Sequence, residues 1–298
     1  MGVCDSGWSI ARRSTNLGAG MAFEDSGGWF LKTMVRKHRI ASGATQQAIA
    51  DELFYSPDTI RAWELGRATI PLKMLARYAK ACGVNDEIIG YMVQVAIARR
   101  EGKPVEADMR FNALFMSLAE EFFGSFFKFD ATFIPGPLQL KEYHDLIVRP
   151  ADPEASDDES KDGWVFKEAR RIALEDRPDQ PMMSFLIGEA ALVHLRRFSE
   201  ELYQKQMAYL RKWAKRPGVS IRILREPVPV RMSGFSIYQP EDMPRACPPF
   251  VYTEIADTSW CIDDPDRIAR YDELRKRLWK MAIRIEVYRD DDRRDRMA

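Results

Sequence analysis

The stretch ATQQAIADELFYSPDTIRAWELGR, residues 44–67, carries the signals of two short helices separated by a tight turn. Thr45 stands just before the first apolar-periodic segment, where its hydroxyl suits an N-cap. The second segment restarts at Ser56 with Pro57 at the first helical position, and Gly66 suits its C-terminal end. Two short helices joined by a turn of about four residues form a helix-turn-helix unit.

This region differs in charge from the rest of the chain. Between Gly28 and Val84 nine residues are basic and four are acidic, a net charge of +5, while the whole chain of 298 residues is neutral, so the remainder carries −5. A basic segment of this kind can neutralise DNA phosphates, which gives sequence-independent affinity that falls steeply with salt. The neutral total therefore does not exclude double-stranded DNA as a partner.

Residues 30–84 resemble the phage-repressor-like, or xenobiotic-response-element (XRE), family of helix-turn-helix regulators. The resemblance rests on TQ at the start of helix two, S-P-x-T-I at the start of helix three and WExGR at its end. It implies an all-α domain of about five helices whose third helix enters the major groove. The turn reads FYS where a glycine is frequent, so Phe54 should either pack inward or face DNA or a partner.

The resemblance also implies which side chains contact DNA. The outward positions of helix three are Ser56, Asp58, Thr59, Arg61 and Ala62. Arg61 could bind guanine O6 and N7 together, or it could contact phosphate only, and both interpretations stay open. At helix two, Thr45 and Gln46 are expected to bind phosphate and Gln47 to reach a base, and Arg67 and Lys73 are further phosphate candidates. Each of these side chains could instead be an ordinary solvated one.

A structural ion pair is implied as well. Arg39 and Glu64 match family positions at which an arginine of helix one pairs with a glutamate of helix three. We expect the two groups to be largely buried and within hydrogen-bond reach.

The C-terminal part predicts an α+β fold with a mainly antiparallel sheet. Short apolar or alternating runs ended by Gly or Pro predict strands at 181–188, 219–226, 234–240 and 249–256. Helical spacing of apolar residues predicts helices at 200–216 and 264–283.

The same part resembles the domain of unknown function 5753 of actinobacterial regulators. FIPGPLQLKEYHDLIV at 133–148 is close to a phrase that follows such N-terminal domains, and EAALVHLRR, QMAYLRKWAKRPGVSIRILRE, FVYTE and YDELRKRLWKMAI continue the match. The resemblance spans about residues 110–285. It implies a cytoplasmic regulator, often encoded beside a small partner protein.

The predicted organisation is a disordered leader (1–27), a helix-turn-helix domain (28–102), an α+β effector-binding or partner-binding domain (103–288) and a flexible tail (289–298). Within the third part, residues 149–163 hold six acids, two prolines and no aromatic, which predicts a solvated acidic loop.

Enzymatic chemistry is not expected. The three histidines form no catalytic or metal-binding spacing, and neither metal nor cofactor is predicted. Glu189 and Glu254 could form a pair of catalytic acids, although strand-end glutamates are more often caps or ion-pair partners. The aromatics Phe126, Phe127, Phe129 and Phe133 could line a ligand pocket, although such residues more often form core.

No apolar run is long enough to span a bilayer, and four cysteines without a CxxC motif favour the reducing cytoplasm. The sequence thus predicts a DNA-binding transcriptional regulator, expected to be a homodimer. The alternative is an antitoxin-like interaction protein that binds a small co-encoded partner and uses DNA only for autoregulation. A short neighbouring reading frame would favour the second, and scattered operators the first.

Overall fold

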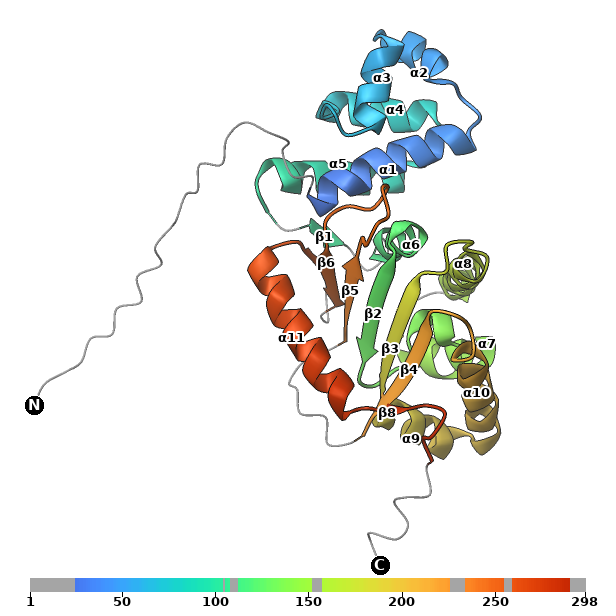
Figure 1. The fold of residues 1–298 in the computed structure, drawn as a ribbon. Coiled ribbons are helices and arrows are strands. Elements are labelled where there is room, and N and C mark those ends of the chain that lie inside the picture. The colour runs from blue at the N-terminus through green and yellow to red at the C-terminus, as the bar shows by residue number, and fades with distance from the viewer. Residues whose placement is uncertain are drawn as a thin grey trace, which may run out of the picture.

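The computed structural model describes residues 25–103, 105–107, 112–151, 157–225, 234–254 and 259–289. A bundle of five helices, which we call the head (25–103), sits on one end of a larger α+β unit, which we call the body (105–289) (Figure 1). The predicted fold class is confirmed, including a sheet in which five of the seven strand pairs are antiparallel.

The head contains the five helices that the sequence predicts. They are α1 (Ser26–Ala41), α2 (Gln46–Leu53), α3 (Pro57–Glu64), α4 (Leu72–Ala81) and α5 (Asp86–Arg100). Four begin at side-chain caps: Asp25, Thr45, Ser56 and Asn85 each accept a hydrogen bond from a backbone N–H of the first turn. Because α1 begins at Ser26, the predicted leader (1–27) is two residues too long, and residues 1–24 lie outside the described part.

The body is built on an eight-stranded sheet in the order β1-β7-β6-β5-β2-β3-β4-β8. The strands are β1 (Val105–Ala107), β2 (Ser125–Asp130), β3 (Met182–Gly188), β4 (Val219–Leu224), β5 (Phe235–Gln239), β6 (Phe250–Glu254), β7 (Ser259–Ile262) and β8 (Ile283–Arg284). The sheet is mixed: β2 pairs in parallel with β3 and β3 with β4, while the other pairs are antiparallel. All four predicted strands form, as β3, β4, β5 and β6.

Helices cover both faces of this sheet (Figure 1). One face packs on α11 (Pro265–Met281), where Leu278 belongs to the same hydrophobic cluster as Phe127 and Leu186. The other face lies under α6 (Asn112–Phe122), α8 (Asp157–Glu175), α9 (Glu189–Phe198) and α10 (Glu200–Trp213). Along the chain, between β2 and α8, lie the short turn η1 (Gly136–Leu138) and the run α7 (Lys141–Tyr143), η2 (His144–Val148) and η3 (Arg149–Ala151).

The acidic loop predicted at 149–163 is wrong in its second half, because α8 begins at Asp157. Three of its six acids, Asp157, Asp158 and Glu159, fall in the first turn of this helix, where negative charge is favourable toward the positive end of the helix dipole. Residues 152–156 lie outside the described part, as do 290–298 of the predicted tail. The aromatics Phe126, Phe127 and Phe129 are buried on β2, in agreement with core packing.

The head and the body share one hydrophobic cluster. Trp29 of α1 is fully buried, contacts the rings of Phe115, Phe123 and Phe250, and donates through Nε1 to the carbonyl of Arg245 at 2.8 Å. The ring of Phe30 stacks on Phe115 at 4.9 Å. The N-terminal half of α1 is therefore anchored in the body, while its C-terminal half carries the helix-turn-helix unit.

Helix α5 is the last helix of the head. It lies mainly against α4 and α1 and also touches β1 of the body. Arg99 of this helix holds the Asp25 carboxylate at 2.7 Å, which ties the end of α5 to the start of α1.

Candidate nucleic-acid interface

The turn between α2 and α3 adopts the left-handed backbone that a glycine usually takes. Phe54 ends α2 with φ 61° and ψ 43°, and its side chain is 87% exposed. Of the two alternatives for this aromatic, the outward one is observed. Tyr55 beside it turns its ring edge toward Trp63 of α3, with centroids 5.0 Å apart. The turn is thus closed by an aromatic pair rather than by a glycine.

Helix α3 separates a buried face from a polar one. Ile60, Trp63 and Glu64 are buried, whereas Asp58 and Arg61 are exposed and Thr59 and Ala62 are half-buried. Ser56 caps the helix by accepting from the Thr59 N–H at 3.2 Å, and the two hydroxyls lie 2.9 Å apart. The side chains expected to face DNA lie toward the outer side of the helix.

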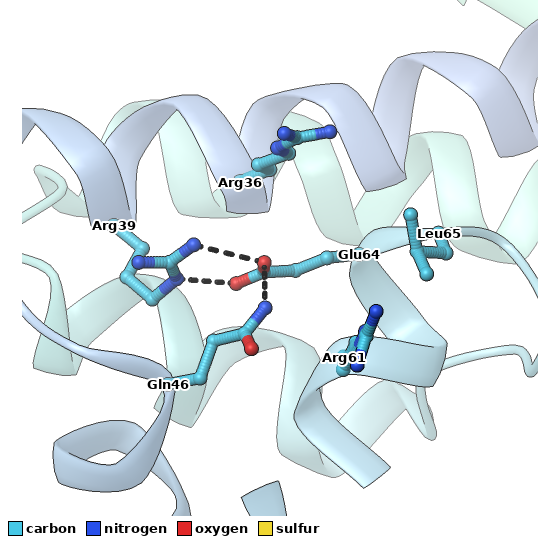
Figure 2. A pocket seen from close by; sticks show the side chains of 6 residues that line it. All are labelled: Arg36, Arg39, Gln46, Arg61, Glu64 and Leu65. Atoms are coloured by element: carbon cyan, nitrogen blue, oxygen red, sulfur yellow. Dashed lines mark hydrogen bonds and ion pairs between the residues drawn. The ribbon is translucent and has the colours of Figure 1, made fainter. Parts of the chain in front are cut away.

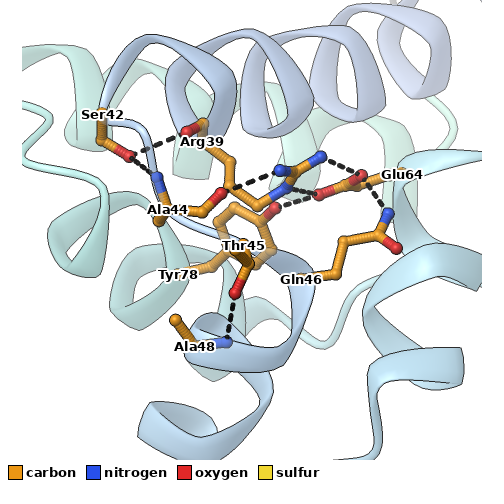
Figure 3. Close-up of polar contacts among 8 residues, drawn as sticks. All are labelled: Arg39, Ser42, Ala44, Thr45, Gln46, Ala48, Glu64 and Tyr78. Carbon is orange, nitrogen blue, oxygen red and sulfur yellow. Dashed lines mark hydrogen bonds and ion pairs between the residues drawn. The ribbon is translucent and has the colours of Figure 1, made fainter.

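The orientation of α3 is fixed by Glu64. Arg39 Nε donates to Glu64 Oε1 at 2.5 Å and Nη2 donates to Oε2 at 2.9 Å, so the expected ion pair is present (Figure 3). The side chain of Glu64 is 2% exposed and that of Arg39 13%. Tyr78 of α4 donates to Oε1 at 2.5 Å and Gln46 of α2 donates to Oε2 at 2.7 Å. This carboxylate therefore connects α1, α2, α3 and α4.

The protonation state of this network is well defined. Burial opposes ionisation of Glu64, but the hydrogen bonds from Arg39, Tyr78 and Gln46 outweigh it and lower the pKa of Glu64. The hydrogen bond to Glu64 raises the pKa of Arg39, and burial raises the pKa of Tyr78. The carboxylate and the guanidinium are therefore both charged at neutral pH, and the phenol is neutral.

An open pocket of about 210 Å³ lies beside this network, between α1, α2 and α3. It is lined by Arg36, Arg39, Gln46, Arg61, Glu64 and Leu65 (Figure 2). Arg39 is occupied by Glu64 and by the carbonyl of Ala44 at 2.9 Å. In the described part of the chain, the side chains of Arg36 and Arg61 have neither a hydrogen bond nor an ion pair, and Figure 2 shows them with Glu64 between them.

Sequence reasoning missed Arg36 and Tyr78. Arg36 precedes Arg39 by three residues, and this i, i+3 spacing places both on one face of α1, so the signal was available. Tyr78 reaches Glu64 from the next helix, 14 positions along the chain, and no local pattern indicates that contact.

The remaining candidates have the following positions. Thr45 caps α2 by accepting from the Ala48 N–H at 3.0 Å, and Gln47 donates to Asp51 at 2.7 Å. Gln46 is half-buried and donates one hydrogen bond from its side-chain amide to Glu64. Arg67 and Lys73 are exposed beyond α3 and at the start of α4. All of these groups are placed on the head, and their contacts with DNA stay predictions.

The two glutamates considered as paired acids do not meet. Glu189 follows β3 and Glu254 ends β6, and strands β5 and β2 lie between them. Three strand spacings of about 4.8 Å put the two positions roughly 14 Å apart, beyond the span of about 5–9.5 Å over which paired carboxylates act. Glu189 accepts instead from Tyr288 at 3.2 Å, and Glu254 accepts from Tyr252 at 2.8 Å.

The comparisons with known proteins agree with this architecture. A family model described as a helix-turn-helix domain matches residues 33–88, so the head contains a helix-turn-helix domain. The model of the family described as Domain of unknown function (DUF5753) matches residues 121–286, more than half of the chain, and the chain belongs to that family. No curated protein and no solved structure matches the chain significantly.

Within the described residues, none of the helices combines the length and the apolar character needed to cross a membrane.

Proposed function

We propose that this protein is a sequence-specific transcriptional regulator that inserts α3 into the major groove of DNA, and that it is not an enzyme. The observation that carries the proposal is the Glu64 network. It clamps α3 to α1, α2 and α4 while the outer side of α3 stays polar and open. A recognition helix held by a buried ion pair presents its side chains in one orientation, which sequence discrimination requires.

Arg36 and Arg61 are proposed to hold one DNA phosphate in the pocket between α1 and α3. Three arginines and one glutamate line that pocket, so it carries an excess of two positive charges. A guanidinium fork matches a phosphate in geometry as well as charge. This argument favours the phosphate-contact interpretation of Arg61 over guanine recognition.

Base recognition then falls to the N-terminal half of α3. The Asp58 carboxylate can accept from cytosine N4, the Ala62 methyl can contact a thymine methyl, and the Thr59 hydroxyl can bond to several bases. Asp58 is exposed at the first turn of the helix, where the positive dipole end stabilises its charge. Gln47 is a further candidate, provided that it leaves Asp51 when DNA binds.

A homodimer is proposed because one head of this size contacts few base pairs. Two copies related by a two-fold axis would read half-sites one DNA turn apart. The body would supply the dimer contact and bind an effector or a small co-encoded protein. Nothing in the geometry of the described residues favours the antitoxin-like alternative, which stays the competing hypothesis.

The experiment is a genome-wide map of bound DNA followed by titration of the strongest site at several salt concentrations. We expect Arg36→Ala and Arg61→Ala each to weaken binding to the operator and binding to random DNA by a similar factor. Each should reduce the slope of log K against log salt by about one unit. Lys205→Ala on α10, which removes an exposed cation that is paired with Glu201 in the body, is the matched control and should change neither.

Three outcomes would contradict parts of this proposal. If no site is bound above background, the regulator hypothesis fails and the partner-binding alternative gains. If Arg61→Ala relaxes preference at one base pair and leaves random DNA unaffected, Arg61 contacts a base. If the complex sediments with one protein chain per operator, the dimer is wrong.

A further inference from the structure

A second cavity lies at the junction of head and body, on the flank of α1 where Lys37 extends toward α6 and α8. It has a volume of about 190 Å³ and is enclosed by α1, α6 and α8. Its rim carries the exposed residues Lys37, Glu121, Ala169 and Ala173, and its floor holds Glu120 and Arg170. Phe166 and Leu174 add an apolar wall.

The floor is a buried cluster with more positive than negative charge. Arg170 holds Glu120 by two hydrogen bonds, at 2.9 and 2.6 Å, and Lys128 of β2 holds the same carboxylate at 2.8 Å. Lys128 also donates to the hydroxyl of Tyr238 at 2.8 Å. Burial would raise the pKa of Glu120, but the charges of Arg170 and Lys128 outweigh it and lower the pKa to about 2. Two cations thus share one anion.

The guanidinium of Arg170 has N–H donors that Glu120 does not use. Its side chain is 8% exposed, and Nε and Nη2 both donate hydrogen bonds to Glu120. Among the described residues no hydrogen bond involves Nη1. Nη1 is not one of the buried side-chain atoms that lack a partner, so it is in contact with solvent, and an entering acceptor can replace that water. Because Arg170 lines the cavity, an acceptor that enters it can reach these donors.

We propose that this cavity is the binding site of a small organic anion, a carboxylate or a phosphate monoester with a compact apolar part. The anion would accept from Arg170 Nη1 and from Lys37, and its apolar part would lie against Phe166 and Leu174. The cavity volume suits a ligand with a single small ring, and such mixed linings are typical of small-molecule sites.

The position of the site gives it a regulatory consequence. Lys37 belongs to α1, and it holds Glu121 of α6 at 2.5 Å across the head–body junction. Two residues further along the same helix, Arg39 holds Glu64 of the recognition helix. A ligand that binds Lys37 in place of Glu121 would break this ion pair between head and body. It would replace the pair with a ligand-mediated contact next to the helix-turn-helix unit. This consequence rests on the proposed DNA-binding function, whereas the ligand site does not.

The test is calorimetric titration of the full chain, without DNA, with benzoate, phenyl phosphate, inorganic phosphate and benzamidine. We expect benzoate or phenyl phosphate to bind and to raise the melting temperature. Inorganic phosphate lacks the apolar part and should bind more weakly, and the cation benzamidine should not bind. Whichever of the two organic anions binds more tightly identifies the anionic group.

Substitutions then place the binding site. Lys37→Gln should weaken binding about tenfold, which corresponds to the loss of one charge-assisted hydrogen bond. Ala173→Glu puts a carboxylate three residues after Arg170 on the same helix face, where it would occupy the anion's place and abolish binding. Ala173→Gln, of equal size and without charge, should retain most of the affinity. Both substitutions are at an exposed helical position that suits long side chains, so folding is preserved.

The proposal is overturned if neither organic anion binds with a dissociation constant below about 1 mM. It is also overturned if benzamidine binds equally well, or if Ala173→Glu and Ala173→Gln behave alike. DNA affinity is measured separately, with and without the anion. Anion binding by a chain that does not bind DNA would refute only the regulator function, and DNA binding without anion binding would refute only this site.

Discussion

Substitution of Glu64 by Gln is the sharpest test of the structural account of the head. The carboxylate receives four hydrogen bonds, two on each oxygen: Oε1 accepts from Arg39 and Tyr78, and Oε2 accepts from Arg39 and Gln46. A glutamine has one oxygen and one NH₂ group. Its NH₂ group would therefore face the Arg39 donor and the donor of either Tyr78 or Gln46, and none of these can accept a hydrogen bond from it. Glu64→Gln thus removes two hydrogen bonds and the charge that neutralises Arg39.

The magnitude follows from these contacts. A hydrogen bond to a charged group contributes about 1.5–3 kcal/mol, and breaking one partner of a buried ion pair costs about 3–5 kcal/mol. The two figures describe the same contacts and do not add. Because the Arg39 side chain is 13% exposed and can recover some hydration, we expect about 3 kcal/mol, toward the lower end of that range.

The assay is urea unfolding of the full chain followed by circular dichroism, combined with hydrogen exchange of the α3 amides. Glu52→Gln is the matched control, because Glu52 is exposed on α2, and it should stay within about 0.5 kcal/mol of the wild type. A loss below about 1 kcal/mol for Glu64→Gln, with unchanged exchange in α3, would refute the claim that this carboxylate fixes the recognition helix.

The pH dependence provides an independent check on the same residue. The pKa of Glu64 in the folded protein lies below its ordinary value of 4.5. The unfolded state therefore takes up the proton first, and the stabilisation by ionised Glu64 is present above pH 4.5 and lost as the pH falls through the folded pKa. The difference in unfolding free energy between wild type and Glu64→Gln should be constant near neutrality and shrink below about pH 4.5. A constant difference down to pH 3 would contradict a charge-based role.

Three further expectations follow from other parts of the head. Lys73→Ala should weaken binding to the operator and to random DNA alike, and it should reduce the slope of log K against log salt by about one unit in anisotropy titrations. An unchanged slope would show that Lys73 does not contact DNA phosphate. Phe54→Gly should raise the unfolding free energy by about 0.5–1 kcal/mol, because it relieves a left-handed backbone at an exposed position. Unchanged or lower stability in urea would show that the larger conformational entropy lost by a glycine on folding outweighs this relief. Trp29→Ala should cost about 3–5 kcal/mol, because a fully buried ring is lost, and should expose protease sites between head and body; a loss under about 1 kcal/mol would show that the docking is weak.

How far the sequence predicts this structure depends on the range of each signal. The helix boundaries of the head follow from local capping chemistry at Thr45 and Ser56, and the structure confirms both caps. Strand β2 was missed because four consecutive residues of SFFKFD are buried, so the alternation that marks a half-buried strand is absent. The start of α8 was missed because its acids were read as a solvated run, although acids also favour a helix N-terminus.

The same distinction holds for the candidate site. The pairing of Arg39 with Glu64 was expected from a family resemblance, while the contributions of Tyr78 and Gln46 to it depend on how α2 and α4 pack around α3. The cluster of Glu120, Lys128 and Arg170 joins α6, β2 and α8. Residues 8 to 50 positions apart in sequence meet there, and only the tertiary fold brings them together.

Helix α1 is the element on which the two halves of the molecule depend together. Its first turn is held by the body through Trp29, which donates to a body carbonyl, and its last turn holds the recognition helix through Arg39. Between them, Lys37 borders the cavity at the head–body junction. Since α1 is one continuous helix, we expect a change in how the body holds its first turn to shift Arg39, Glu64 and hence α3. A shift in α3 must in turn alter the head–body contacts, because coupling between two binding sites is reciprocal. If α3 binds DNA as proposed, a body that holds α1 in this way would influence that binding without touching DNA.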